Sequence, residues 1–133
     1  MTQRTVFLAR LIGLFTLLTV AGLLTRGGAF VESLVADGPL MFTFAIIGLG
    51  IGVAMVLGHN RWSGGVLPVV VTLVGWLSLA KGLLLLFLSP ETLTPFYARM
   101  HYGEHFDLYL APSLGLGLYL TWAGFKADYS QRP

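Results

Sequence analysis

The chain has 133 residues, of which 56% are hydrophobic and 11% charged. Soluble domains carry about 25% charged residues, so this composition excludes an ordinary soluble globule and indicates a protein that uses lipid as its solvent. The net charge is +2, but the basic residues are scattered and flank apolar runs, so we predict no nucleic-acid partner. The chain has no cysteine, which excludes disulfides and thiolate metal sites.

Four apolar runs are long enough to cross a hydrocarbon core, which needs about 20 residues of helix. They cover residues 6–24, 40–57, 66–88 and 108–125. We expect helices because the strands of a membrane barrel would be shorter and would alternate in polarity. Residues 1–133 are therefore predicted to form one domain, an all-α integral membrane four-helix bundle.

The basic residues gather on one side of this predicted bundle. That side holds both termini and the 58–65 loop, and its basic residues are Arg4, Arg10, Arg61, Lys126 and Arg132. The other side carries Arg26 and Arg99 with five acids, Glu32, Asp37, Glu91, Glu104 and Asp107. Because cytoplasmic loops carry an excess of Lys and Arg, we predict a multi-pass protein with both termini in the cytoplasm. Arg10 lies in the opening turns of the first run, from which its side chain can extend to the headgroups.

The two halves of the chain resemble each other, with repeat units at residues 1–58 and 66–126. Residues 12–16 match residues 74–78 around a shared glycine, and residues 48–51 match residues 115–118 around a shared Gly-x-Gly. Each unit contains two helices, so both units enter the membrane in the same direction, which predicts two tandem parallel two-helix repeats. The alternative is a chance alignment of leucine- and glycine-rich segments.

The two outer loops are predicted to contain short interfacial helices. Thr94-Pro95 is a typical helix start, with an N-cap residue followed by proline at the first helical position. We expect one or two helical turns over residues 96–101, and an equivalent segment over residues 29–36 in the first half.

The third run contains one charged residue, Lys81, about seven residues from its outer end. This depth is roughly 10 Å at helical rise, part of which the lysine stem recovers by extending outward. A charge inside a span is costly and usually has a partner, and the predicted partner is Asp107, with Glu104 second. Two interpretations stay open: a structural ion pair or outward-extended lysine, and a site for an anion, a proton or a lipid headgroup.

Residues 101–105 carry the H-x-x-E-H pattern of inverted zinc peptidases, with His101, Glu104 and His105 as its members. On a helix such histidines share a face and bind zinc, and the glutamate acts as the base. Gly103 interrupts the helix and no third ligand is evident, so we predict neither a catalytic metal nor a cofactor. A structural or adventitious metal, a pH-responsive patch and a plain hydrated loop stay open.

The turn between the halves reads His59-Asn60-Arg61-Trp62. The tryptophan and the arginine are typical of an interfacial anchor on the cytoplasmic side of a membrane. The alternative is a docking site for a lipid phosphate or a partner protein.

Small residues four apart recur in three of the predicted spans and allow helix backbones to approach closely. The pairs are Gly48 with Gly52, Ser78 with Gly82, and Ser113 with Gly117. We expect these pairs to pack helices within the bundle, and the alternative is association between bundles.

One stretch of the chain carries a longer pattern, His59-Asn60-x-Trp62 followed by Thr72-x-x-Gly75-Trp76-x-x-x-x-Lys81-Gly82 and a leucine run. This pattern resembles a group of small bacterial four-span inner-membrane proteins of uncharacterised function. The resemblance implies a location in the bacterial inner membrane and brings no activity. The 89–107 loop with its histidines lies outside it.

The predicted spans contain no serine–histidine–carboxylate set, no glycine-rich phosphate loop and no acidic metal cluster. We therefore predict a non-enzymatic structural or accessory protein, acting as a homo-oligomer or as a small subunit of a membrane complex. Its partners would be membrane lipid and either itself or another membrane protein. The alternative is a small oligomeric channel or transporter that uses Lys81 for an anion or a lipid.

Overall fold

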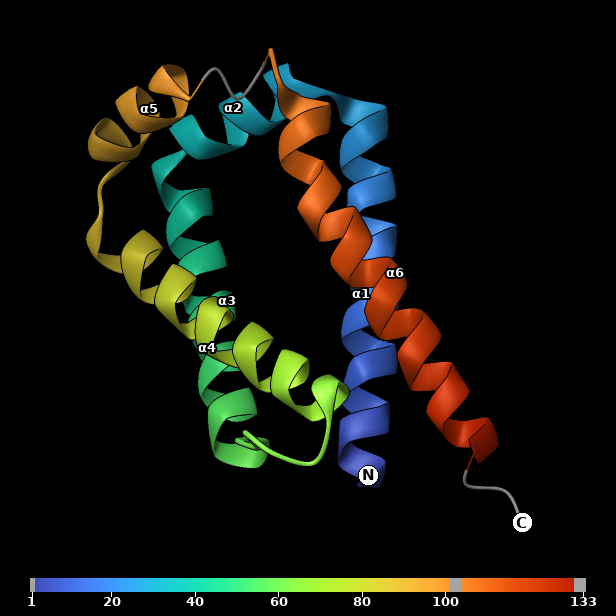
Figure 1. The fold of residues 1–133 in the computed structure, drawn as a ribbon. Helices are drawn as coiled ribbons and strands as arrows, with labels where there is room; N and C mark the ends of the chain where they lie inside the picture. The colour runs from blue at the N-terminus through green and yellow to red at the C-terminus, as the bar shows by residue number, and fades with distance from the viewer. Residues whose placement is uncertain (1, 101–103, 131–133) are drawn as a thin grey trace.

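The structure, a computed structural model, describes residues 2–100 and 104–130 (Figure 1). These residues form helices and no strand, which confirms the all-α prediction. The helices are α1 (Gln3–Arg26), α2 (Gly28–Ala36), α3 (Gly38–Gly58), α4 (Val66–Phe87), α5 (Pro90–Arg99) and α6 (Phe106–Ser130). Each half of the chain therefore holds a long helix, a short helix and a second long helix.

Local sequence explains where the helices of the first half begin and end. Thr2 Oγ1 accepts a hydrogen bond from the Thr5 N–H at 3.3 Å at the start of α1. Asp37 Oδ1 accepts one from the Leu40 N–H at 3.0 Å at the start of α3. Both are N-caps, which satisfy backbone donors that the first helical turn leaves unpaired. Gly27 separates α1 from α2 with a φ of +84°, a conformation that favours glycine.

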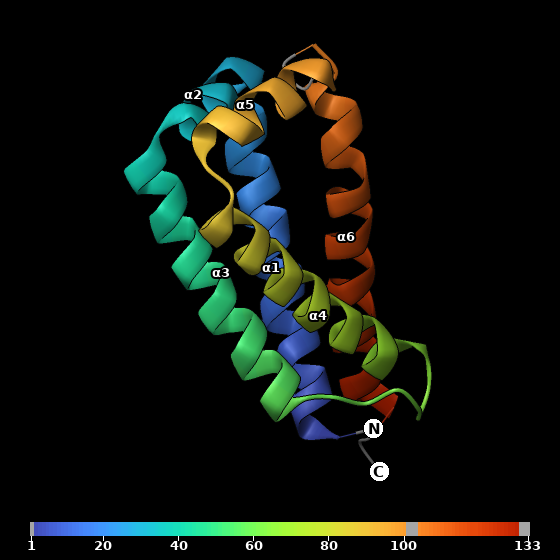
Figure 2. The same ribbon diagram turned by 90° about the vertical axis from the view of Figure 1, so that its left-hand side faces the viewer.

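The short helices lie at the end of the molecule opposite the start of α1 and the end of α6 (Figures 1 and 2). α2 matches its predicted range within one residue. α5 begins at Pro90 and not at Thr94-Pro95 as predicted, because Ser89-Pro90 supplies the same N-cap and first-position signals one turn earlier. Pro95 consequently stands inside α5, where it removes one backbone hydrogen bond.

The long helices pair between the halves of the chain. α1 packs antiparallel along α6, and α3 packs antiparallel along α4 (Figures 1 and 2). The consecutive long helices α1 and α3 make little contact with each other, and so do α4 and α6. The two predicted tandem repeats are therefore not packing units: each half lays its long helices against those of the other half.

Matched glycines of the two predicted repeats occupy matched contacts. Gly13 of α1 faces α6, where an added Cβ would lie 2.6 Å from the Thr121 backbone nitrogen. Gly75 of α4 faces α3, where an added Cβ would lie 2.9 Å from Met55 Cβ. In both pairs a glycine allows the first long helix of one half to approach the last long helix of the other.

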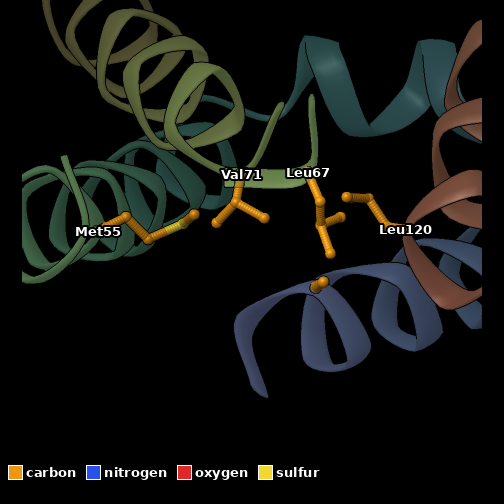
Figure 3. Packing of buried hydrophobic residues seen from close by; sticks show 5 residues of the cluster. Met55, Leu67, Val71 and Leu120 are labelled. Carbon is orange, nitrogen blue, oxygen red and sulfur yellow. The ribbon is translucent and has the colours of Figure 1, made fainter. Parts of the chain in front are cut away.

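One buried cluster contains residues from all four long helices (Figure 3). In it, the first turns of α4 contact both α3 and the α1–α6 pair. Its members are Ala9, Met55, Leu67, Val71 and Leu120. Two smaller clusters lie towards the other end of the bundle. One joins α1 to α6 through Val20, Phe106 and Leu110, and the other joins α2, α3 and α5 through Val35, Met41 and Leu93.

Much of the outer surface of the long helices is apolar. Leu18, Leu57 and Phe87 are each more than 70% exposed, as befits side chains that face lipid. In the described residues, α1, α3 and α4 are long and apolar enough to span a membrane, which supports the prediction of a membrane protein. α6 is not among these three helices, because residues such as Tyr109 and Pro112 lower its hydropathy.

Gly52→Ala should destabilise the α3–α4 pair, whereas Gly50→Ala should not. A Cβ at Gly52 would lie 2.5 Å from Leu79 Cα, so the helices would have to separate, while a Cβ at Gly50 meets nothing within 4 Å. We expect Gly52→Ala to cost about 1–3 kcal/mol, measured as a lower thermal-unfolding midpoint in detergent. Equal midpoints for the two variants would contradict this packing.

Candidate functional site

The loop between α3 and α4 is held to α4 by a buried threonine. Thr72, 1% exposed, accepts a hydrogen bond on Oγ1 from the Arg61 backbone N–H at 2.9 Å. The Thr72 hydroxyl also lies 2.9 Å from each of the carbonyl oxygens of Arg61 and Pro68, between which it shares its single proton. One side chain thus binds both backbone groups of Arg61 and fixes the position of the loop.

His59 is the second buried polar residue of this region. Its side chain is 4% exposed, and Nε2 lies 3.3 Å from the Pro68 carbonyl oxygen. Since a carbonyl oxygen only accepts, this hydrogen bond requires the proton on Nε2. His59 also ends α3, where its backbone N–H donates to the Met55 oxygen at 2.7 Å.

Asn60 joins two tryptophans at the surface. Its Oδ1 accepts hydrogen bonds from Trp62 Nε1 at 2.8 Å and from Trp76 Nε1 at 3.4 Å. The first tryptophan belongs to the loop and the second to α4. Asn60 therefore ties the predicted interfacial anchor to the helix that follows it.

These contacts account for most of the pattern on which the resemblance to small bacterial membrane proteins rests. His59, Asn60, Thr72 and the tryptophans position the loop, while Gly75 and Gly82 allow α4 to approach α3. Lys81 is the member of the pattern that this packing does not use.

The small-residue pairs of α3 and α4 are used within the protein, as expected. Ser78 Oγ donates a hydrogen bond to the Gly48 carbonyl oxygen at 3.1 Å. A Cβ at Gly82 would lie 2.5 Å from the Leu49 backbone nitrogen, and Gly52 lies as close to Leu79. In α6, Gly117 is buried against Leu17 of α1, and Ser113 is half-buried.

Lys81 lies on the outward side of α4. Its side chain is exposed, and it makes no hydrogen bond or ion pair with any residue that the structure describes. Leu73, Leu77 and Leu84 are also exposed and follow the same side of the helix at intervals of four, four and three residues. We call these four residues the Lys81 face: an apolar surface with one cation in it.

The predicted ion pair between Lys81 and Asp107 is absent. Asp107 lies in the first turn of α6, and α6 packs on α1, with little contact to α4. The prediction failed because α4 packs on α3, which leaves Asp107 at the start of α6 without a place beside Lys81. Glu104, the second candidate, is exposed and likewise makes no ion pair with Lys81 among the described residues.

The structure describes only part of the predicted histidine pattern. His101 lies outside the described residues, and the side chain of His105 is exposed. Within the part of the chain that the structure describes, no group of three His, Cys, Asp or Glu residues is placed to hold a metal ion. The interpretations of residues 101–105 therefore stay predictions.

Arg10 makes contacts with α6 that the sequence did not predict. Its Nε donates a hydrogen bond to the Gly124 carbonyl oxygen at 3.1 Å, and its guanidinium lies 4.7 Å from the centre of the Phe125 ring. The half-buried side chain is held on α6.

The channel or carrier alternative would place Lys81 beside a path. Three pockets of the described residues have volumes of about 570, 270 and 380 Å³, and Lys81 lines none of them.

Comparison with known proteins finds no match to this chain among family models, curated proteins or solved structures. The resemblance to small bacterial inner-membrane proteins therefore stays a prediction. The function has to be argued from the residues and their arrangement.

Thr72→Val should loosen the 59–65 loop, whereas Thr72→Ser should not. Valine leaves the Arg61 N–H without its hydrogen-bond acceptor, while serine keeps the hydroxyl. In detergent, we expect trypsin to cleave Thr72→Val after Arg61 about tenfold faster than the wild type. Unchanged cleavage of the valine variant would show that Thr72 does not hold the loop.

Proposed function

We propose that this protein is a non-enzymatic subunit of the bacterial inner membrane that binds a second membrane protein through the Lys81 face. The observation that carries the proposal is the exposed Lys81 ammonium, which has no partner in the described chain although it lies in a helix able to span a membrane. Charged side chains inside membranes are usually paired or face water. A partner on this face would supply the opposite charge that the described residues do not place beside Lys81.

The energetic reason is the cost of leaving a lysine in lipid. Insertion of a lysine at the centre of a membrane helix costs about 2.5–3.5 kcal/mol, and outward extension of its stem removes only part of this. A carboxylate from a neighbouring helix would remove more, because the two charges attract strongly in a medium of low dielectric constant. The apolar leucines around Lys81 would bury against the same neighbour.

Sequence favours a different protein over a second copy as the source of that carboxylate. The spans predicted at residues 6–24, 40–57, 66–88 and 108–125 contain no Asp or Glu. A second copy could offer only its outer acids, such as Asp107, at the membrane surface. A homo-oligomer is therefore the less favoured form of the same proposal.

The glycines of the predicted small-residue pairs already have neighbours within the chain. Gly52, Gly82 and Gly117 each lie against another helix of the same chain. At these three positions the close packing that drives self-association of glycine-rich helices is satisfied internally. The Lys81 face is an exposed surface that stays available to another protein.

We also propose that α6 is a fourth span and that both termini are cytoplasmic. α6 contacts α1 at both ends: Val20 packs with Phe106 and Leu110, and Arg10 binds Gly124. A helix that follows a spanning helix over this length has to share its environment. The excess of basic residues near the termini supports the cytoplasmic orientation.

Lys81→Met should release the partner, whereas Lys81→Arg should retain it. Native mass spectrometry of protein extracted gently from its own membrane would compare both variants with the wild type and with Leu77→Met. We expect loss of the hetero-complex only in Lys81→Met, by at least tenfold in abundance, since one desolvated ion pair is worth more than 1.4 kcal/mol. A monomeric wild type, or a complex that survives in Lys81→Met, would overturn the proposal. Anion flux that requires Lys81 in reconstituted vesicles would favour the channel alternative.

Single cysteines should report the topology directly, because the chain contains none. Ser33→Cys in α2 should react with an impermeant maleimide in intact spheroplasts. Ser63→Cys in the α3–α4 loop and Lys126→Cys near the end of α6 should react only after permeabilisation. If Lys126→Cys reacts together with Ser33→Cys, α6 is not a fourth span.

A further inference from the structure

A polar pocket opens at the end of the bundle that holds the start of α1 and the end of α3. Its volume is about 570 Å³. The residues that line it are Thr2, Gln3, Arg4, Gly58, His59, Asn60 and Arg61. The hydrogen bonds of His59 and Thr72 fix one wall, because they hold the loop that carries Arg61.

A second, apolar pocket of about 380 Å³ continues from the first. The two share Arg4 and Gly58, and the second runs between α1 and α3 along Phe7, Leu8, Ile51, Ala54 and Met55. It exists because α1 pairs with α6 and α3 pairs with α4, so the facing sides of α1 and α3 make little contact. Phe7 and Ile51 remain exposed along it, at 63% and 48%.

The charge of the pair of pockets is entirely positive. Arg4 and Arg61 line the polar pocket, and no Asp or Glu lines either one. Both arginine side chains are exposed, and neither guanidinium has a hydrogen bond or ion pair with the described residues. Guanidinium groups match phosphate oxygens in geometry and charge.

We infer that this compound site binds an anionic phospholipid of the membrane leaflet next to the termini. The phosphate lies against Arg4 and Arg61, and an acyl chain follows the apolar pocket between α1 and α3. A free phosphate ion would use the arginines but not the apolar continuation. Basic pockets between membrane helices are typical sites for anionic headgroups.

The lipid site is independent of the Lys81 face. Lys81 lies six residues from the end of α4 at Phe87, whereas the pockets adjoin the opposite end, where α4 begins. Loss of one function should therefore leave the other intact.

The test is a titration of purified, delipidated full-length protein with phosphatidylglycerol and with phosphatidylcholine, followed by native mass spectrometry. We expect the double variant Arg4→Gln/Arg61→Gln to bind phosphatidylglycerol about 25-fold more weakly, since each basic residue at a membrane surface contributes about fivefold. The matched control is Arg26→Gln/Arg99→Gln, which removes the same charge at the other end. Equal weakening in both double variants, or none in the first, would overturn the site.

A third variant tests whether the apolar pocket binds the acyl chain. Ala54→Trp fills the apolar pocket from its exposed side and leaves the charge unchanged. We expect at least fivefold weaker binding of phosphatidylglycerol and an unchanged thermal midpoint. If Ala54→Trp binds the lipid normally while inorganic phosphate displaces it, the site takes phosphate alone and the phospholipid assignment is wrong.

Discussion

The close approach of α3 and α4 decides much of the arrangement around it. Gly52 and Gly82 lack side chains where the two backbones nearly touch, and Ser78 adds a hydrogen bond to the Gly48 carbonyl oxygen. With α3 engaged by α4, α1 packs on α6, and the facing sides of α1 and α3 stay apart. The apolar pocket beside Arg4 is a direct result of this pairing, which leaves α1 and α3 with little contact.

The same contact divides α4 into two sides. Gly75, Ser78 and Gly82 face α3, so Lys81, one residue before Gly82, turns about 100° away from that interface. Its neighbours on the outward side are exposed leucines. The side of α4 that is rich in small residues thus packs on α3, and the side that carries the charge stays exposed.

Much of the helical layout could be predicted, and much of the pairing could not. The apolar runs located the helices, and the Gly28–Ala36 helix was expected from the position of the outer loop. The small-residue pairs of α3 and α4 correctly indicated packing within the chain. The Lys81–Asp107 pair was wrong and the contact of Arg10 with α6 was not predicted, because both depended on which helices lie side by side. Helical periodicity reports which side of a helix is apolar, but in a chain apolar on nearly every side it does not select the neighbour.

By itself, the sequence determined that this is a helical membrane chain, with small residues where backbones can meet and one lysine within an apolar run. These properties follow from composition and local spacing, which need no knowledge of distant contacts. Only the tertiary structure decided that the halves exchange helices, that Thr72 holds Arg61, and that Arg4 and Arg61 share a pocket. Those features depend on which helices and loops lie side by side, which local spacing does not specify.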